Sequence, residues 1–158
     1  MTDDQFTHDP TQSRNVPGDT LQSFEQAKAA VEEGGGDGLG FVVTRHDPFL
    51  VVEVGNGRKE ERLAPAVEPI LSAFGETFTE ADDDGLIRLF YEGTLPGSLH
   101  GGGPVVVMVG GENQKHGFRL FDSGWTPVTG RHISGTPTEP NPIDDDALRE
   151  FLSQAEKL

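Results

Sequence analysis

Short runs of β-branched and aromatic residues recur through the middle of the chain, and turn-forming residues separate them. Runs of this kind favour the strands of a sheet. The sequence predicts strands at residues 39–44, 49–54, 78–80, 86–92, 105–109, 118–121 and 125–129. The last two flank Asp122-Ser123-Gly124, so we expect them to form a hairpin. Apolar residues of these strands, placed together in one sheet, should lie in the core: Phe41, Val43, Val52, Leu89 and Val107.

Helical periodicity appears before, between and after these strands. A first helix is predicted from Asp19 or Thr20 to the glycines at 34–36, and a second at residues 60–74. Pro69 indicates that this second helix is kinked or starts late. A terminal helix opens at 144–146, where acidic residues suit the positive end of the helix. The order predicts an α+β protein with a mostly antiparallel sheet flanked by helices.

The chain length fits one domain. Residues 1–18 are polar and contain two prolines, so we expect them to be a flexible tail. Residues 19–158 then form a single domain that ends in the C-terminal helix.

The chain is strongly acidic, with 27 acidic and 12 basic residues and a formal net charge of −15. This charge would weaken the compact state in dilute buffer, but in molar salt the Debye length falls to about 3 Å and the repulsion is screened. Excess carboxylates with only four lysines favour a halophilic protein. The alternative is an acidic protein of an ordinary organism that avoids nucleic acid.

No cysteine occurs, which excludes disulfide-linked partners, thiol catalysis and Cys-ligated metals. No apolar run approaches the length of a membrane span, and the acidic start does not resemble a signal peptide. We therefore expect a cytoplasmic protein without a membrane partner.

Several residues that could bind a metal or a phosphate have a simpler structural explanation. Gly101–Gly103 is not followed by the Lys-Ser/Thr and helix of a phosphate loop, so these are turn glycines. Asp82–Asp84 lacks the spacing of a calcium loop and suits a solvated turn. The histidines show no metal-ligand spacing on a helix. Glu53 ends an apolar strand, where a carboxylate can hold Mg²⁺ or Mn²⁺, but Gly55 supplies no second ligand on its face.

A series of motifs follows in one order along the chain. It comprises Leu21, Phe24 and Ala27, then Gly38-Leu39-Gly40-Phe41, Asp47-Pro48-Phe49, Leu95-Pro96, Val128-Thr129-Gly130-Arg131-His132 and Gly135-Thr136-Pro137. Over roughly residues 20 to 138, the chain resembles the primase-polymerase domain of the archaeo-eukaryotic primase superfamily, the bifunctional DNA primase/polymerase N-terminal domain. The resemblance implies a primase-polymerase-like core and, in active members, DNA primase/polymerase activity with Mg²⁺ or Mn²⁺.

The departures from this pattern fall at the positions that carry the family's chemistry. The catalytic Asp-x-Asp pair becomes Glu53-Val54-Gly55, and Arg119 stands at the third acidic position. The phosphate-holding segment aligns with residues 82–88 and has Arg88 or Ile87 at its histidine position. Since these positions line one cleft in the family, we predict that Glu53, Arg88 and Arg119 converge as an ion-pair cluster. The alternative is that both arginines point to solvent on the opposite sheet face, one residue out of register.

The leading hypothesis is a catalytically inactive primase-polymerase-like domain that binds nucleic acid or protein as an accessory module in DNA replication or a mobile element. Its partner would be DNA or a replication protein, and it would need no cofactor. One alternative is an active nucleotidyltransferase whose Mg²⁺ or Mn²⁺ site is rebuilt from Glu53 and Asp82–Asp84. Another is a protein-interaction domain without a nucleic-acid role. The candidate binding residues are Arg88, Arg119, Arg131 and His132.

Overall fold

The structure is a computed structural model of the 158-residue chain. It describes residues 6–7, 24–34, 38–59, 62–82, 85–110 and 114–156.

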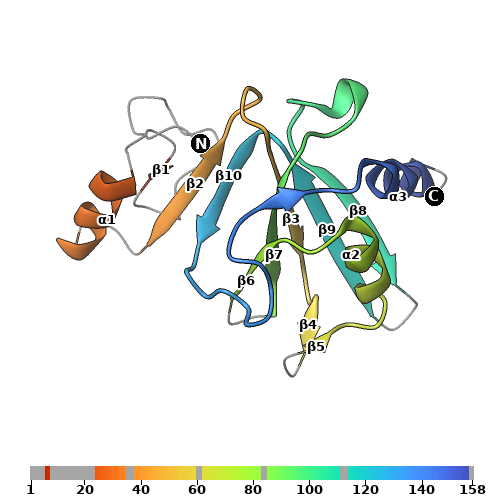
Figure 1. The fold of residues 1–158 in the computed structure, drawn as a ribbon, viewed down its shortest axis with the longest axis horizontal. Coiled ribbons are helices and arrows are strands. Elements are labelled where there is room, and N and C mark those ends of the chain that lie inside the picture. The colour runs from red at the N-terminus through yellow and green to blue at the C-terminus, as the bar shows by residue number, and fades with distance from the viewer. Residues whose placement is uncertain are drawn as a thin grey trace.

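Two sheets organise the described residues (Figure 1). The larger, called here the main sheet, has six strands in the order β11-β7-β3-β9-β8, with β6 also paired to β7. The small sheet has three strands in the order β1-β2-β10. All strand pairings are antiparallel except that of β11 with β7. The strands of the main sheet are β3 (Phe49–Val54), β6 (Phe78–Ala81), β7 (Ile87–Glu92), β8 (Val105–Gly110), β9 (Lys115–Phe121) and β11 (Asn141–Pro142).

The small sheet consists of β1 (Phe6–Thr7), β2 (Leu39–Val43) and β10 (Gly124–Val128), and helix α1 (Phe24–Glu32) contacts its first two strands. A separate two-stranded ribbon joins β4 (Arg58–Lys59) to β5 (Arg62–Leu63). Figure 1 shows the small sheet and α1 on one side of the main sheet, and the other two helices on the opposite side. The predicted α+β class with a mostly antiparallel sheet is therefore confirmed.

Alternation along the strands gives the main sheet two different faces. Leu50, Val52 and Val54 of β3 point to the face covered by α2 (Glu68–Phe74) and α3 (Asp145–Glu156). This helix-covered face holds the larger apolar core, which also takes residues from β7, β8 and β9. Val51 points the other way and packs in a second cluster with Phe41, Val43 and Phe121. Glu53 shares that second face, which fixes where the candidate site can lie.

The five predicted core residues are all buried, but their expected common sheet is wrong. Phe41 and Val43 belong to β2 in the small sheet, whereas Val52, Leu89 and Val107 belong to the main sheet. The second predicted helix begins at Glu68, not at residue 60, and Pro69 lies in its first turn, where no backbone N–H is required. Residues 62–63 form β5 instead.

The predicted hairpin around Asp122-Ser123-Gly124 is also wrong. β9 pairs with β3 and β8, while β10 crosses to the small sheet and pairs with β2. The cause lies at Asp122, whose buried carboxylate accepts hydrogen bonds from the backbone N–H groups of Leu95 at 2.9 Å and Gly101 at 2.8 Å. These bonds hold the turn against the β7–β8 connection, which contains the short 3₁₀ helix η2 (Gly97–Leu99).

Of the predicted tail at 1–18, the structure describes Phe6 and Thr7, which pair with Phe41 and Gly40 of β2. The other residues of this segment lie outside the described part. The described helices include none that is both long enough and apolar enough to cross a bilayer.

Candidate functional site

A row of four charged residues crosses the main sheet on the face opposite to α2 and α3. The strand register places Glu80 beside Arg88, Arg88 beside Glu53, and Glu53 beside Arg119. The residues come from β6, β7, β3 and β9 and alternate in sign. We call this set the charged row.

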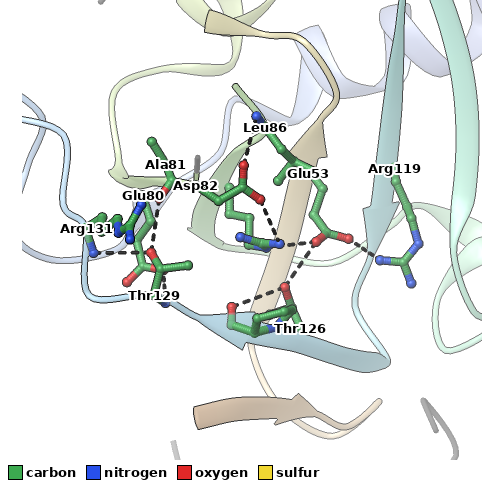
Figure 2. A network of polar contacts seen from close by, with 11 residues as sticks. Glu53, Glu80, Ala81, Asp82, Leu86, Arg119, Thr126, Thr129 and Arg131 are labelled. Carbon is green, nitrogen blue, oxygen red and sulfur yellow. Dashed lines mark hydrogen bonds and ion pairs between the residues drawn. The ribbon is translucent and has the colours of Figure 1, made fainter. Parts of the chain in front are cut away.

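Glu53 is the centre of the charged row and is 5% exposed. Its Oε2 accepts a hydrogen bond from Arg88 Nε at 3.0 Å, and its Oε1 accepts one from Arg119 Nη1. Thr126 of β10 donates a further hydrogen bond from Oγ1 to Oε2 at 3.2 Å. Figure 2 shows Arg119 and Thr126 pointing toward the Glu53 carboxylate from two different strands. The predicted convergence of Glu53, Arg88 and Arg119 is confirmed, and the alternative with both arginines on the opposite face is wrong.

Arg88 joins Glu53 to a second acid. Its Nη2 lies 3.6 Å from Asp82 Oδ2, and Asp82 also accepts a hydrogen bond from the Leu86 N–H at 3.2 Å. The Arg88 side chain is almost fully buried, so a guanidinium here requires carboxylate partners. Two guanidinium groups are thus balanced by the carboxylates of Glu53 and Asp82.

Glu80, at the end of the charged row, is held by backbone donors. Its Oε2 accepts from the Thr129 N–H at 3.0 Å, and its Oε1 accepts from the Gly130 N–H at 3.2 Å. Glu80 is 1% exposed, and its carboxylate fixes the segment after β10 to β6. Sequence reasoning missed Glu80, although its position in a short strand, alternating with Phe78, was a signal that it shares the Phe78 face.

Two other predicted site residues adjoin Glu80 at the end of the charged row: His132 forms an isolated antiparallel bridge with Glu80, and the Arg131 carbonyl accepts a hydrogen bond from the Ala81 N–H at 3.1 Å. Arg131 is exposed, and His132 Nε2 is 2.9 Å from both the Pro137 carbonyl and the Thr136 hydroxyl. The His132 ring stacks on Phe78, with 5.0 Å between the ring centroids. Gly55 follows the end of β3 and donates its N–H to the Gly117 carbonyl at 3.0 Å.

An apolar hollow of about 220 Å³ opens between the two sheets beside Glu80. Three of the phenylalanines that line it, Phe49, Phe78 and Phe90, are only half-buried, so their rings remain partly accessible. We call it the aromatic hollow. Its full lining is Phe41, Phe49, Phe78, Glu80, Phe90, Val128, Thr138 and Pro140.

The arrangement is poorly suited to hold a divalent cation. Both oxygens of Glu53 face guanidinium groups, which would repel a metal ion at the same position. Within the described ranges, no three side chains of His, Asp or Glu gather as metal ligands. Of the acids that the alternative metal site would use, Asp82 contacts Arg88, while Asp83 and Asp84 lie outside the described residues.

No protein-family model matches this chain, and no curated protein matches it in sequence. Function is therefore inferred from the charged row and the aromatic hollow.

Proposed function

We propose that this protein is a primase-polymerase-like domain without polymerase activity, which binds nucleic acid as an accessory module in DNA replication or a mobile element. The observation that carries this proposal is the pairing of Glu53 with Arg88 and Arg119. Two-metal phosphoryl transfer needs carboxylates that are free to hold cations. Here both carboxylate oxygens of Glu53 are paired with guanidinium groups, so this carboxylate is not free to hold a cation.

Nucleic acid suits the surroundings of the charged row. Aromatic side chains stack on bases with about 1–3 kcal/mol per base, and they tolerate any sequence. The aromatic hollow offers partly accessible rings of this kind. Of the two arginines, Arg119 is the more accessible, with a side chain that is 20% exposed against 7% for Arg88, so Arg119 is the one that a phosphate oxygen could reach. Because the chain carries a net charge of −15, we expect weak binding with a preference for single strands.

The test is the binding of a fluorescent single-stranded oligonucleotide, followed by anisotropy across a KCl series. Phe90→Leu removes a ring of the aromatic hollow and should weaken binding several-fold. Phe151→Leu is the matched control, because Phe151 packs in the core on the helix-covered face. Equal binding by both variants, or no binding by the natural chain at any salt concentration, would contradict the proposal.

Absence of polymerase activity is tested separately by calorimetry with Mn²⁺ and a deoxynucleoside triphosphate in molar KCl. We expect no metal-dependent heat, and primer extension should give no product. Metal-dependent binding that Glu53→Gln abolishes would favour the active nucleotidyltransferase instead.

A protein-interaction role is the second candidate, and one observation favours it. Val106 and Met108 of β8 are 63% and 52% exposed, and β8 is the edge strand of the main sheet. Exposed apolar edges are sites where other chains pair. If Met108→Lys changes the association state of the protein while oligonucleotide binding is absent, this second role replaces the first.

A further inference from the structure

A separate cavity of about 550 Å³ lies where three segments meet: the end of β2 with the turn after it, the connection between η2 and β8, and the turn between β9 and β10. Its polar lining comprises Thr44, Arg45, Arg119 and Ser123, together with the backbone of Gly101–Pro104. We infer that this cavity is a binding site for a phosphate group. The inference does not depend on the proposed function, because Arg119 is the only residue of the charged row that lines the cavity.

The charge of the lining is opposite to that of the whole protein. Two arginines and no acidic side chain are among the described residues that line the cavity, on a chain whose net charge is −15. The acids nearest in sequence already have partners. Asp47 accepts hydrogen bonds from the backbone N–H and the hydroxyl of Thr44, both at 2.8 Å. Asp122 is fully buried and accepts from the backbone N–H groups of Leu95 and Gly101. The cavity is therefore a local positive site that an anion can enter.

Arg119 is fixed in place before any ligand arrives. Its Nη1 donates to Glu53, and its guanidinium lies over the Phe121 ring at 4.5 Å from the ring centroid. Its Nη2 is buried and has no hydrogen-bond partner among the described residues, whereas the side chain as a whole is 20% exposed and lines the cavity. An arginine that is already held in place can offer the accessible part of its guanidinium group to a phosphate with little further loss of side-chain freedom.

Arg45 supplies the second positive charge. It is exposed, and within the described part of the chain no carboxylate lies within ion-pair distance of it. Gly101 allows this side chain to lie against the loop, because a Cβ built on Gly101 would come within 3.1 Å of the Arg45 Cβ. Gly101 also has a φ of +71°, which favours glycine. A substitution at this position would thus strain the backbone and push the Arg45 side chain by a few tenths of an ångström.

Phosphate fits this lining better than a carboxylate does. A phosphate group offers enough oxygens to accept from two guanidinium groups and from the Ser123 hydroxyl at the same time. The cavity volume also leaves room for an organic group attached to the phosphate. Free phosphate, a nucleoside monophosphate and the backbone of a nucleic acid share this chemistry, so the experiment must separate them.

The test is a titration of the full chain with inorganic phosphate, followed by the backbone amide signals of Gly103 and Ser123 in NMR spectra. Ionic strength is held constant with KCl. We expect saturable shifts at these amides, and Arg45→Gln should weaken the affinity about tenfold, as expected for the loss of one hydrogen bond to a charged group. Arg131→Gln is the matched control, because it removes the same charge from an exposed arginine that does not line the cavity.

Two results would overturn the inference: shifts that do not saturate, or equal losses in Arg45→Gln and Arg131→Gln. Gly101→Ala is a second variant, in which both arginines are kept, and its affinity for phosphate should also be lower. Titrations with a nucleoside monophosphate, and with a single-stranded oligonucleotide with and without a terminal phosphate, then identify the source of the phosphate. Loss of oligonucleotide binding at the aromatic hollow, with phosphate binding at the cavity retained, would contradict the proposed function alone.

Discussion

Both faces of the main sheet contain buried apolar residues, but the charged row lies on one of them alone, the face opposite to α2 and α3. On the helix-covered face, Phe118 and Leu120 of β9 join the large apolar core, and Phe151 of α3 packs on Phe118 with ring centroids 5.1 Å apart. On the opposite face of the same strand, Arg119 donates to Glu53. Neighbouring residues of one strand thus make two kinds of interaction, apolar packing on one face and a buried ion pair on the other.

This difference separates the face that stabilises the fold from the face on which the candidate site lies. Apolar burial stabilises directly, by about 25 cal/mol for each Å² of apolar surface removed from water. A buried ion-pair cluster gives little net stability, because the desolvation of its charges offsets their attraction. The charged row is therefore poorly explained as a device for stability, which is consistent with the site proposed here. Its members nevertheless depend on one another, since the removal of Glu53 leaves Arg119 without its carboxylate partner and Arg88 with Asp82 alone.

The largest expected effect concerns the helix-covered face. Phe118→Ala should lower the free energy of unfolding by about 3–5 kcal/mol, because the fully buried ring leaves a cavity in the main core. Val106→Ala, on the exposed side of the neighbouring strand β8, should change it by less than about 0.5 kcal/mol. Urea denaturation of both variants measures the contrast. Similar losses in the free energy of unfolding would mean that Phe118 is not buried, or Val106 not exposed, as the structure shows them.

The second prediction concerns the charged row. Glu53→Gln should cost about 3 kcal/mol, since it leaves Arg88 and Arg119 without their shared carboxylate in a buried site. Replacing the three residues together, by Glu53→Leu, Arg88→Met and Arg119→Met, should recover most of that loss, because the charges around Glu53 are all removed, while Asp82 keeps its hydrogen bond from the Leu86 N–H and is 26% exposed.

Equilibrium denaturation in molar KCl compares the single and the triple variant. Molar salt limits the contribution of surface repulsion, so the difference reports mainly on the buried groups. A triple variant that is no more stable than Glu53→Gln would show that these residues contribute as packed side chains, not as coupled charges.

The sequence predicts those features of the two faces that depend on neighbouring residues, and it does not predict those that depend on contacts between residues far apart in the chain. The longer strands and the helices, apart from the start of α2, follow from local patterns. The meeting of Glu53, Arg88 and Arg119 follows from period-two alternation combined with the motif order. The division into two sheets has no such local signal. Whether Asp122-Ser123-Gly124 closes a hairpin or redirects the chain depends on hydrogen bonds from Leu95 and Gly101, which are 27 and 21 residues away in sequence.

Glu80 illustrates the same limit within the candidate site. In the sequence it stands among other acidic residues and has the composition of a solvated strand. Its burial is possible only because Thr129 and Gly130, 49 and 50 residues further on, present backbone N–H groups to its carboxylate. No property of the segment 78–81 specifies these partners, so the charged row could be predicted at its centre but not at its end.

The third prediction uses Tyr91, the only tyrosine of the chain, which lies in the apolar core. Its hydroxyl donates to the Gly75 carbonyl at 2.7 Å, and burial raises the pKa of the phenol above its ordinary value. The unfolded chain loses the phenolic proton near a pKa of about 10, whereas the folded chain keeps it. The free energy of unfolding should therefore fall by about 1.4 kcal/mol for each pH unit above that value.

Tyr91→Phe is the control for other groups that titrate in alkali. The variant should be less stable by about 1 kcal/mol at neutral pH, because it lacks the hydrogen bond to Gly75, but this difference should disappear at high pH. A constant difference between the two proteins across this range would contradict the raised pKa. The appearance of tyrosinate absorbance before unfolding would contradict it as well.

The smallest expected effect tests whether the small sheet contributes to the charged row. Thr126 of β10 is fully buried and donates to Glu53 at 3.2 Å, so Thr126→Val removes one hydrogen bond and keeps the shape of the side chain. The variant should lose about 1 kcal/mol, whereas Thr126→Ser, which keeps the hydroxyl, should lose less. The same Thr126→Val change in the triple variant should be neutral or stabilising, since the carboxylate that accepts the bond is no longer present. The difference between the two backgrounds measures the coupling of β10 to Glu53. An equal loss in both backgrounds would mean that Thr126 acts on packing alone, and that the charged row belongs to the main sheet without a contribution from the small one.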